Sequence, residues 1–440
     1  MFDKMFDWNR NTRIVAAGVL AGLMWAQAPA AHAFLYLDDM WEQPAYGVEP
    51  TVTWGIVPDG TTLPTGNGEP DAGSSLIGVL DEGFGVINGS SDLTTRPWFG
   101  LYQESFERWD QLSGLTFQYM PEDDGARVRS SYDPNHDSPG VPGVRPDIRT
   151  GGHYIDGEGV GSGSLAYAYY PDYGDIVFDT GNANLYSNLA EYPVLHDLFS
   201  NLIMHEIGHA IGLEHVVSPD AVMVMNTSVS GGTQWGPQFG DILNLHYAYG
   251  DRFEAGAGND TLETATFATT FTEDASWSIG TDAGSSNVVA RDAVDFVSID
   301  SRYRADADGE ADFFHFTLDV DGTLDALLTS VGPAYGSSGE GSTDQYLRDT
   351  SVLSDLALEI LDAQGNRVAL ADVVGLGGSE SLMDVMLTQG DYYARITGKT
   401  NSIQMYTLDL DFMAVPEPGT FLLVALASGV GVLRRRSRHA

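Results

Sequence analysis

Residues 205–215 read HEIGHAIGLEH and bring three histidines and a glutamate together within a few positions. His205 and His209 are four residues apart, so on a helix both imidazoles project from one face and can bind the same ion. Gly212 allows the helix to end and the chain to turn back, which brings His215 round as a third ligand. Three neutral imidazoles leave one position of a tetrahedral Zn²⁺ ion open, as catalysis requires. The stretch therefore predicts a catalytic zinc site on a helix.

The glutamate inside this stretch and the segment behind it extend the pattern. Glu206 follows the first ligand and is placed to point at a water on the metal rather than at the metal itself. The pattern HExxHxxGxxH is the signature of the metzincin zinc peptidases. In VVSPDAVMVMN, which follows directly, Pro219, Ala221 and Met223 stand where the matrixin branch has a proline, an alanine and its turn methionine. The chain therefore resembles matrixins, which implies Glu206 as general base and Met223 beneath the metal.

The resemblance extends over roughly residues 50–250 and implies where substrate binds. SFERWDQLSGLTF resembles the first matrixin helix with the strand after it, and SLAYAYYP resembles the edge strand of the sheet. An extended peptide adds to such an edge through backbone hydrogen bonds. The expected edge residues are Ser164, Leu165, Ala166, Tyr167, Ala168 and Tyr169. Met225, Asn226 and Thr227 replace the family's Pro-x-Tyr at the wall of the specificity pocket, so substrate preference cannot be carried over.

Metal sites beyond the catalytic one depart from the family pattern. Matrixins hold a structural zinc with histidines in two segments where this chain has Tyr167 and Val177, and of that set His153 alone remains. We therefore expect a second zinc to be absent. Asp179 matches a family calcium ligand, and Asp156 lies in the segment that resembles the same ion-binding loop. The resemblance thus implies a Ca²⁺ site at these two carboxylates.

Hydrophobic periodicity predicts strands and helices over residues 34–252, and the resemblance implies that they form an α+β peptidase domain of the metzincin type, with a twisted mixed sheet and about three helices. The alternation in TVTWGIV predicts an early strand, and GDIVFD a later one. From Pro121 to Gly163 the chain reads as a loop rich in Gly, Asp, Pro and Ser. The predicted helices lie in LYQESFERWDQLSG, from Pro193 to about Gly212, and in FGDILNLHYAYG.

The alternating apolar and polar pattern in residues 253–413 predicts an all-β sandwich. DFFHFTLDV, LALEILDAQGN, GDYYARITG and MYTLDLDF alternate apolar and polar residues, as strands with one buried face do. The stretch PAYGSSGEGSTD, from Pro333 to Asp344, reads as an exposed loop within the sandwich. The strand motifs and NDTLETA resemble the bacterial pre-peptidase C-terminal domain, an accessory module of secreted peptidases.

Both ends of the chain read as targeting segments. Residues 1–33 combine basic residues, a short apolar run and AHA before Phe34, which predicts a secretory signal peptide. Residues 414–440 contain Pro-Glu-Pro, an apolar stretch from Phe421 to Leu433 and an arginine cluster, and they resemble the PEP-CTERM sorting signal of Gram-negative bacteria. That resemblance implies transient anchoring in the inner membrane, cleavage by an exosortase-type sorting peptidase, and a final place outside the cell or on its surface. A permanent, thin membrane anchor is the alternative.

Composition limits the chemistry. With 62 acidic against 21 basic side chains the chain carries a formal net charge of −41, which disfavours nucleic acid as a partner. The same carboxylates serve either solubility or calcium binding. Cysteine is absent, so neither disulfides nor a cysteine nucleophile are available.

The sequence as a whole predicts a secreted zinc endopeptidase that acts on protein or peptide substrates. Zn²⁺ held by His205, His209 and His215 activates a water, and Glu206 takes its proton. The alternative is a cell-surface or matrix-binding protein in which the sandwich is the working part and the zinc-peptidase fold is catalytically idle.

Overall fold

The structure, a computed structural model, describes residues 40–41, 50–66, 68–128, 140–158, 163–171, 173–219, 223–227, 234–300, 311–339, 346–400 and 402–415. All of these belong to one structural unit, Phe34–Ala440. The predicted signal peptide lies outside the described residues, as does the predicted sorting tail except for Ala414 and Val415, and both stay predictions. Within the described ranges, no helix is long and apolar enough to cross a membrane.

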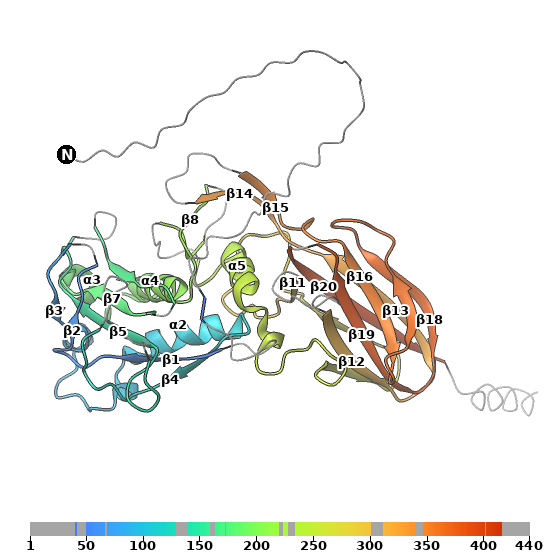
Figure 1. The fold of residues 1–440 in the computed structure, drawn as a ribbon, viewed down its shortest axis with the longest axis horizontal. Helices are drawn as coiled ribbons and strands as arrows, with labels where there is room; N and C mark the ends of the chain where they lie inside the picture. Colours follow the sequence, from blue (N-terminus) through green and yellow to red (C-terminus); the bar gives the residue numbers. More distant parts are fainter. Residues whose placement is uncertain are drawn as a thin grey trace, which may run out of the picture. The chain divides into compact units, whose positions relative to one another are not determined.

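A five-stranded mixed sheet underlies the predicted peptidase domain (Figure 1). Its order is β4-β1-β5-β7-β6, in which the first four strands run parallel and β6 pairs antiparallel with β7 at one edge. The mixed sheet expected from the sequence is therefore present. The strands are β1 (Thr51–Ile56), β4 (Thr116–Tyr119), β5 (Ile148–His153), β6 (Ala166–Ala168) and β7 (Ile176–Asp179), and a small hairpin joins β2 (Thr62–Leu63) to β3 (Ala72–Gly73).

Strand β5 contradicts the loop predicted for residues 121–163, and the prediction is wrong there. All six residues of β5 are buried. A Cβ added to Gly151 would lie 2.9 Å from side-chain carbons of Leu63 and Val57, and one added to Gly152 would lie 2.9 Å from the carbonyl oxygen of Phe178. The two glycines are required by this close packing, yet in a sequence paired glycines resemble a turn.

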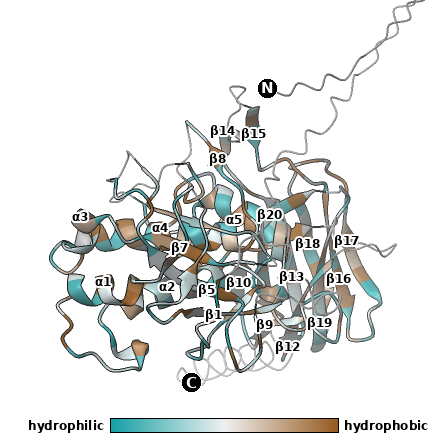
Figure 2. Cartoon of the chain, turned by 60° about the vertical axis from the view of Figure 1, so that its left-hand side comes forward, coloured by the Kyte–Doolittle hydropathy of each residue, from teal (hydrophilic) through white to brown (hydrophobic). Residues whose placement is uncertain are grey.

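Five α-helices accompany the sheet among the described residues, and three of them, α2, α4 and α5, coincide with predicted helices. Helix α2 packs against α4, where the Trp109 indole donates to the Met204 carbonyl at 3.1 Å. Hydrophobic and hydrophilic residues are interspersed along the helices (Figure 2), as expected for helices with one buried face. The bounds are α1 (Leu76–Gly83), which is not among the predicted helices, α2 (Phe99–Gln111), α3 (Ala183–Tyr186), α4 (Pro193–Ala210) and α5 (Phe239–Tyr249), with 3₁₀ turns η1 (Leu93–Thr95) and η2 (Arg252–Glu254).

Two sheets form the sandwich predicted for the C-terminal half. One has the order β10-β20-β13-β18 with β11 also on β20, and the other the order β17-β16-β19-β12-β9. Buried side chains from both sheets make one core, as in Leu328 and Leu408 of the first and Phe316 and Leu358 of the second. The strands are β9 (Thr266–Phe271), β10 (Ala275–Ile279), β11 (Ser298–Asp300), β12 (Ala311–Leu318), β13 (Gly322–Ser330), β16 (Leu356–Asp362), β17 (Arg367–Ala371), β18 (Glu380–Leu387), β19 (Gly390–Gly398) and β20 (Ile403–Ala414).

The exposed loop predicted from Pro333 to Asp344 is wrong for its described part. Strand β14 (Ala334–Gly339) pairs with β15 (Tyr346–Asp349) as a hairpin of the sandwich, and its other edge pairs with β8 (Val216–Val217) of the peptidase domain. The small residues that read as a loop instead allow β14 to lie against its neighbours, with Ser338 fully buried.

Buried polar contacts also join the two halves of the unit away from this hairpin. The Arg108 guanidinium of α2 is 2% exposed and donates to the carbonyl of Ala293 at 2.8 Å. The His246 ring of α5 lies between the carbonyl of Leu112 at 2.7 Å and the hydroxyl of Ser298 at 2.9 Å. The halves are therefore connected through groups that are costly to separate once buried.

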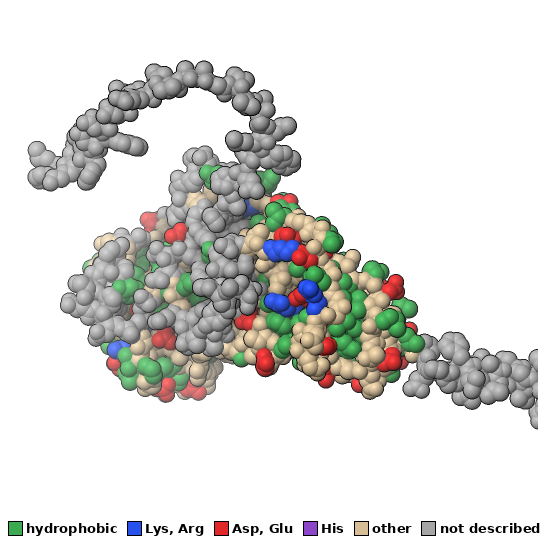
Figure 3. Space-filling view, turned by 45° about the vertical axis from the view of Figure 1, so that its right-hand side comes forward, with side chains coloured by type: hydrophobic (Ala, Val, Ile, Leu, Met, Phe, Trp, Pro, Cys, Tyr) green, Lys and Arg blue, Asp and Glu red, His purple; other side chains and the backbone are tan. Residues whose placement is uncertain are grey.

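Ion pairs at the surface of the sandwich follow from the acidic composition. Figure 3 shows acidic side chains spread over one face, with the few basic ones beside them. Glu359 accepts from both Arg367 and Arg395, at 3.1 and 3.0 Å. Partly exposed pairs of this kind contribute little to stability.

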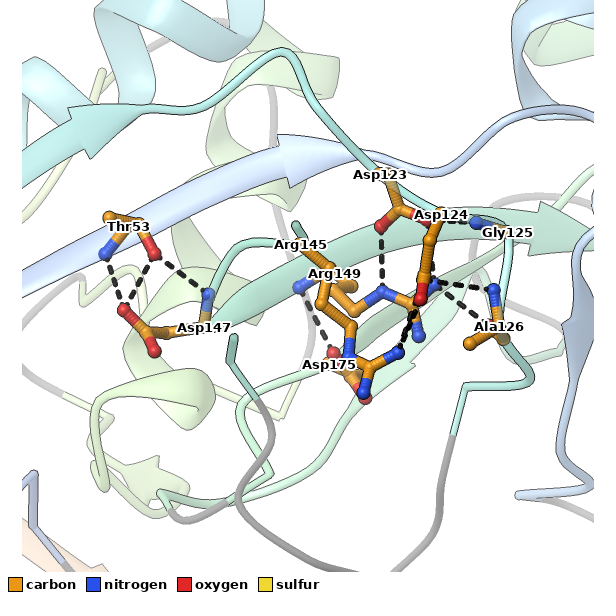
Figure 4. Close-up of polar contacts among 9 residues, drawn as sticks. All are labelled: Thr53, Asp123, Asp124, Gly125, Ala126, Arg145, Asp147, Arg149 and Asp175. Carbon is orange, nitrogen blue, oxygen red and sulfur yellow. Dashed lines mark hydrogen bonds and ion pairs between the residues drawn. The ribbon is translucent and has the colours of Figure 1, made fainter. Parts of the chain in front are cut away.

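A buried ion pair fixes strand β5 to the segment that follows β4 (Figure 4). The Arg149 guanidinium donates to both carboxylate oxygens of Asp123 at 2.7 and 2.8 Å, and both side chains are 3% exposed. Arg149 also donates to the carbonyl of Ala126 at 2.8 Å. The neighbouring pair between Arg145 and Asp124 has a similar distance, 2.9 Å, but its side chains are 21% and 38% exposed.

We predict that these two pairs differ in their contribution to stability. Asp123→Ala leaves the Arg149 charge buried without its partner and should lower the free energy of unfolding by about 3–5 kcal/mol. Asp124→Ala breaks a partly exposed pair and should cost less than about 1 kcal/mol. Urea unfolding of the full chain measures both, and equal losses would contradict the assignment.

Candidate metal centre

Three imidazoles converge at the end of helix α4. The Nε2 atom of His215 lies 3.1 Å from Nε2 of His205 and 3.2 Å from Nε2 of His209. His215 reaches this position because the chain reverses at Gly212, whose φ of +99° lies in the left-handed region that favours glycine. The amide of Leu213 then donates to the carbonyl of Gly208 at 2.8 Å and completes the helix end. The structure thus brings together the three histidines that the sequence selects.

Hydrogen bonds at the other ring nitrogens determine how two of these imidazoles can act. His205 Nδ1 lies 2.7 Å from the carbonyl oxygen of Val224, and His209 Nδ1 lies 2.7 Å from that of Leu213. A carbonyl only accepts, so each Nδ1 carries the proton and each Nε2 presents a lone pair. Burial lowers the pKa of His205 to about 4 and that of His209 well below its ordinary value, so both rings are neutral near pH 7.

The arrangement of lone pairs fits a tetrahedral cation. Neighbouring ligands of a zinc ion with Zn–N bonds of about 2.0–2.1 Å lie roughly 3.3 Å apart, close to the two distances from His215. Neutral imidazole is a nitrogen ligand suited to zinc and other divalent transition metals. Among the described residues, this is the one group of three His, Asp or Glu side chains whose ligand atoms converge on a common point.

Glu206 is placed beside this group. Its side chain is 3% exposed, and its Oε2 atom has no hydrogen-bond partner among the described residues. Burial raises the pKa of Glu206 to about 8, and a cation at the three imidazoles would lower that pKa again by favouring the carboxylate. A buried carboxyl with an unused oxygen next to a candidate metal site is suited to exchange a proton with a water.

The turn after β8 supports the first ligand through its backbone. Val224, whose carbonyl accepts from His205, has its own amide bonded to a carboxylate oxygen of Asp241 at 2.7 Å. Asp241 also accepts from the amides of Met225 at 3.2 Å and Gln238 at 2.8 Å, and it is fully buried on α5. Burial raises the pKa of Asp241 to about 6, while the three amides oppose that shift. Asp241 therefore positions the turn, a role that no local sequence signal indicates.

The two methionines of this turn pack against different helices. Met223, the predicted turn methionine, is 4% exposed, and its Cε would lie 2.3 Å from a Cβ added to Gly240 of α5. Met225 is 1% exposed, and its sulfur would lie 2.2 Å from a Cβ added to Gly208 of α4, the residue before His209. Met225 thus contacts the ligand-bearing helix, which sequence reasoning missed because it places this residue in a pocket wall.

The predicted substrate edge is partly realised as strand β6. Its regular part covers Ala166–Ala168, shorter than the expected Ser164–Tyr169, although Leu165 still accepts from the amide of Asp179 and Tyr169 donates to the carbonyl of Asp175. Directly after it, the ring of Tyr170 meets His209 edge-on at 5.8 Å between centroids. The edge strand therefore leads to the metal centre, and Tyr170 is a neighbour of the site that the sequence does not reveal.

A hydrogen-bonded cluster stands where the family's second zinc is expected. His153 Nε2 lies 3.1 Å from Oε1 of Glu69, and the hydroxyl of Tyr167 donates to the same oxygen at 2.9 Å. Val177 packs in an apolar cluster with Val57 and other buried side chains. Tyr167 and Val177 thus occupy the places of two histidines without offering nitrogen ligands, and a zinc site of the matrixin kind does not fit these residues.

The carboxylates proposed for calcium accept backbone hydrogen bonds. Asp179 is fully buried and accepts from the amides of Ile155, Gly157 and Gly181 at 2.8–2.9 Å. Asp156 accepts from two other amides of the same loop, at 2.7 and 3.0 Å. Both carboxylates organise the loop as it stands, and calcium binding by them stays a prediction.

Comparison with known proteins shows what the segment carrying this centre is similar to. Residues 83–250 match the family model of matrixin. The chain is 32% identical over 128 residues to human matrix metalloproteinase-15, covering 28% of this chain and 17% of that protein. It is 29% identical over 160 residues to mouse matrix metalloproteinase-23, covering 33% of this chain and 35% of that protein. The chain thus spans about a sixth to a third of the length of these relatives.

Comparison with solved structures is less informative. The pre-peptidase C-terminal domain of a collagenase from Bacillus anthracis aligns with 33% of this chain and 95% of its own, at 11% identity and a TM-score of 0.18. The lysozyme inhibitor PliG of Aeromonas hydrophila aligns with 34% of this chain and 99% of its own, at 10% identity and a TM-score of 0.16. Neither similarity is close enough to assign the sandwich to a family.

We predict that the turn held by Asp241 controls how firmly the centre retains metal. Asp241→Asn replaces an acceptor of three amides and should accelerate zinc release to a chelator by at least about 10-fold. Asp179→Asn is the matched control, because Asp179 is equally buried and also accepts from three amides, away from the three histidines. Both changes should destabilise the fold by about 1.5–3 kcal/mol, but only the first should alter zinc release. Equal release rates would contradict the role of Asp241.

Proposed function

We propose that the protein is a secreted, zinc-dependent endopeptidase that hydrolyses peptide bonds of extracellular proteins. The observation that carries the proposal is the convergence of three imidazoles, with the Nε2 atoms of His205 and His209 within 3.2 Å of His215 Nε2, beside a buried glutamate with an unused oxygen. The match of residues 83–250 to the matrixin family model supports the same class of reaction. A structural metal site needs neither a fourth open position nor a buried base.

The residues of the chain divide the chemistry between them. His205, His209 and His215 would hold a zinc ion, which supplies Lewis acidity toward the scissile carbonyl and the attacking water. Glu206 takes a proton from that water and passes it to the leaving amine. Because Glu206 is shielded from solvent, the proton stays within the site between the two transfers.

Substrate is expected to lie along β6 as an additional strand. β6 is at the edge of the sheet, so its outer backbone groups can bond an extended peptide. Tyr170 follows this strand and contacts His209, which supports a substrate strand whose end lies near the scissile bond. Backbone pairing of this kind accepts many sequences, and side-chain pockets would then select among them.

Loss of the base separates this proposal from the idle-domain alternative. Glu206→Gln keeps the size of the side chain and the three ligands but cannot take a proton, so casein cleavage by the full chain should fall about 10²- to 10⁴-fold with one zinc still bound. Asp197→Asn, on the exposed side of the same helix, is the control and should cleave at the wild-type rate. A Glu206→Gln variant with full turnover would contradict the assigned base, and a zinc-loaded wild type that cleaves no protein would favour the binding protein.

Export and sorting form the second part of the proposal. Residues 1–33 would direct export, and the tail from residue 414 would anchor the protein in the inner membrane until an exosortase-type peptidase cleaves it. The mature protein from a Gram-negative host should begin at Phe34 and end near Pro416, as intact-mass measurement can establish. A full-length product in the membrane fraction would instead indicate a permanent anchor.

A further inference from the structure

Strand β8 links the third ligand to the sandwich. Val216 and Val217 follow His215 directly and are bonded on both edges. On one edge the amide of Val216 donates to the carbonyl of Met225 at 2.9 Å. On the other edge Val217 pairs with Ser338 of β14. The backbone next to His215 is therefore held between the methionine turn and a hairpin of the other domain.

Tyr335 of the same hairpin reaches the methionine turn. Its side chain is 3% exposed. A Cβ added to Gly240 would lie 3.0 Å from the Tyr335 hydroxyl oxygen and 2.3 Å from the Met223 methyl carbon. Both groups therefore lie close to Gly240. Burial raises the pKa of Tyr335, the charge of Arg348 opposes that shift, and the charge of Asp241 is near enough to add to it. Tyr335 and Met223 thus pack side by side at Gly240, on the helix whose Asp241 holds the turn.

Polar contacts hold this hairpin in register. The hydroxyl of Ser218, just after β8, donates to the carbonyl of Gly336 at 2.6 Å in a buried position. The guanidinium of Arg348 on β15 donates to the hydroxyl of Ser337 on β14, and both side chains are nearly buried. A slip of the hairpin would leave these donors without acceptors, which is costly inside a protein. The hairpin is therefore a rigid support and not a tethered loop.

We propose that the hairpin of β14 and β15 is a positioning element of the metal centre, in which Tyr335 and the pairing of β14 with β8 hold His215 and the methionine turn. The inference rests on the proposed zinc peptidase function and assigns the sandwich a direct part in it. The sandwich then contributes to metal retention and turnover through two contacts, one beside the third ligand and one beneath the turn that supports the first.

Zinc release from the full chain tests the inference with matched tyrosines. Tyr335→Ala should release zinc to a chelator about 10- to 100-fold faster, the range found when residues that orient metal ligands are lost. Tyr335→Phe keeps the ring but removes the hydroxyl that lies next to Gly240, so it should accelerate zinc release less than Tyr335→Ala does. Tyr392→Ala is the control, because Tyr392 is 9% exposed in the sandwich core and belongs to β19, which does not pair with β8 or β14. It should lower the unfolding temperature without altering zinc release.

Two further measurements keep the test decisive. Ser218→Ala removes the bond to Gly336 with little loss of packing, so it should fold and release zinc several-fold faster even where Tyr335→Ala does not fold. Amide hydrogen exchange of residues 213–227 in the metal-free chain should accelerate in the Tyr335→Ala and Ser218→Ala variants and not in Tyr392→Ala.

The outcomes separate this inference from the proposed function. If the Tyr335→Ala and Ser218→Ala variants both show the amide exchange and zinc release of the wild type, the positioning role is overturned, whether or not the protein cleaves peptides. Equal acceleration in Tyr392→Ala would also overturn it, since the effect would then be general instability. A wild type that binds zinc without cleaving any protein would defeat the peptidase proposal alone.

Discussion

The hydrogen bonds from His205 and His209 to backbone carbonyls are the constraint on which the centre depends. Each bond spans 2.7 Å, fixes the proton on Nδ1 and leaves the Nε2 lone pair directed at the common point. Without those carbonyls the rings could rotate or change tautomer, and three lone pairs near 3 Å apart would repel one another. The surrounding elements can therefore be understood by how they hold two backbone segments, one at Leu213 and one at Val224.

The two segments are held in different ways. Leu213 belongs to the helix end itself, where Gly212 in the left-handed region returns the chain and fixes the Leu213 carbonyl beside His209. Val224 lies in a turn with no regular structure and is held from outside, by Asp241 of α5 through two amides and by β8 through Met225. The second support is therefore distributed over distant parts of the sequence, and the sandwich hairpin is one of them.

This difference explains how far the sequence could predict the structure. The ligands, the base and helix α4 follow from local spacing, because the helical repeat alone brings His205 and His209 to one face. Asp241 and Tyr335 act across long sequence separations and leave no local pattern. Strand β5 and hairpin strand β14 were hidden for a related reason, since glycines and serines that permit close packing also resemble turns. The sandwich strands could be predicted from their alternation of apolar and polar residues, because each strand buries one face.

The cluster of Glu69, His153 and Tyr167 extends the same principle to the substrate edge. Tyr167 lies on β6, and its single hydroxyl proton can be donated to Glu69 Oε1 at 2.9 Å or to the carbonyl of Pro64 at 2.7 Å. The edge strand is thus bonded to the segment after β2 as well as to β7. His153, the last residue of β5, is 1% exposed and shares the carboxylate of Glu69. A strand that accepts a peptide on one side needs to be fixed on the other, and a buried network of directional hydrogen bonds can do this without a metal. Tyr167 in place of a histidine ligand is therefore compatible with an ordered edge, and the order of this site comes from hydrogen bonds where matrixins use an ion.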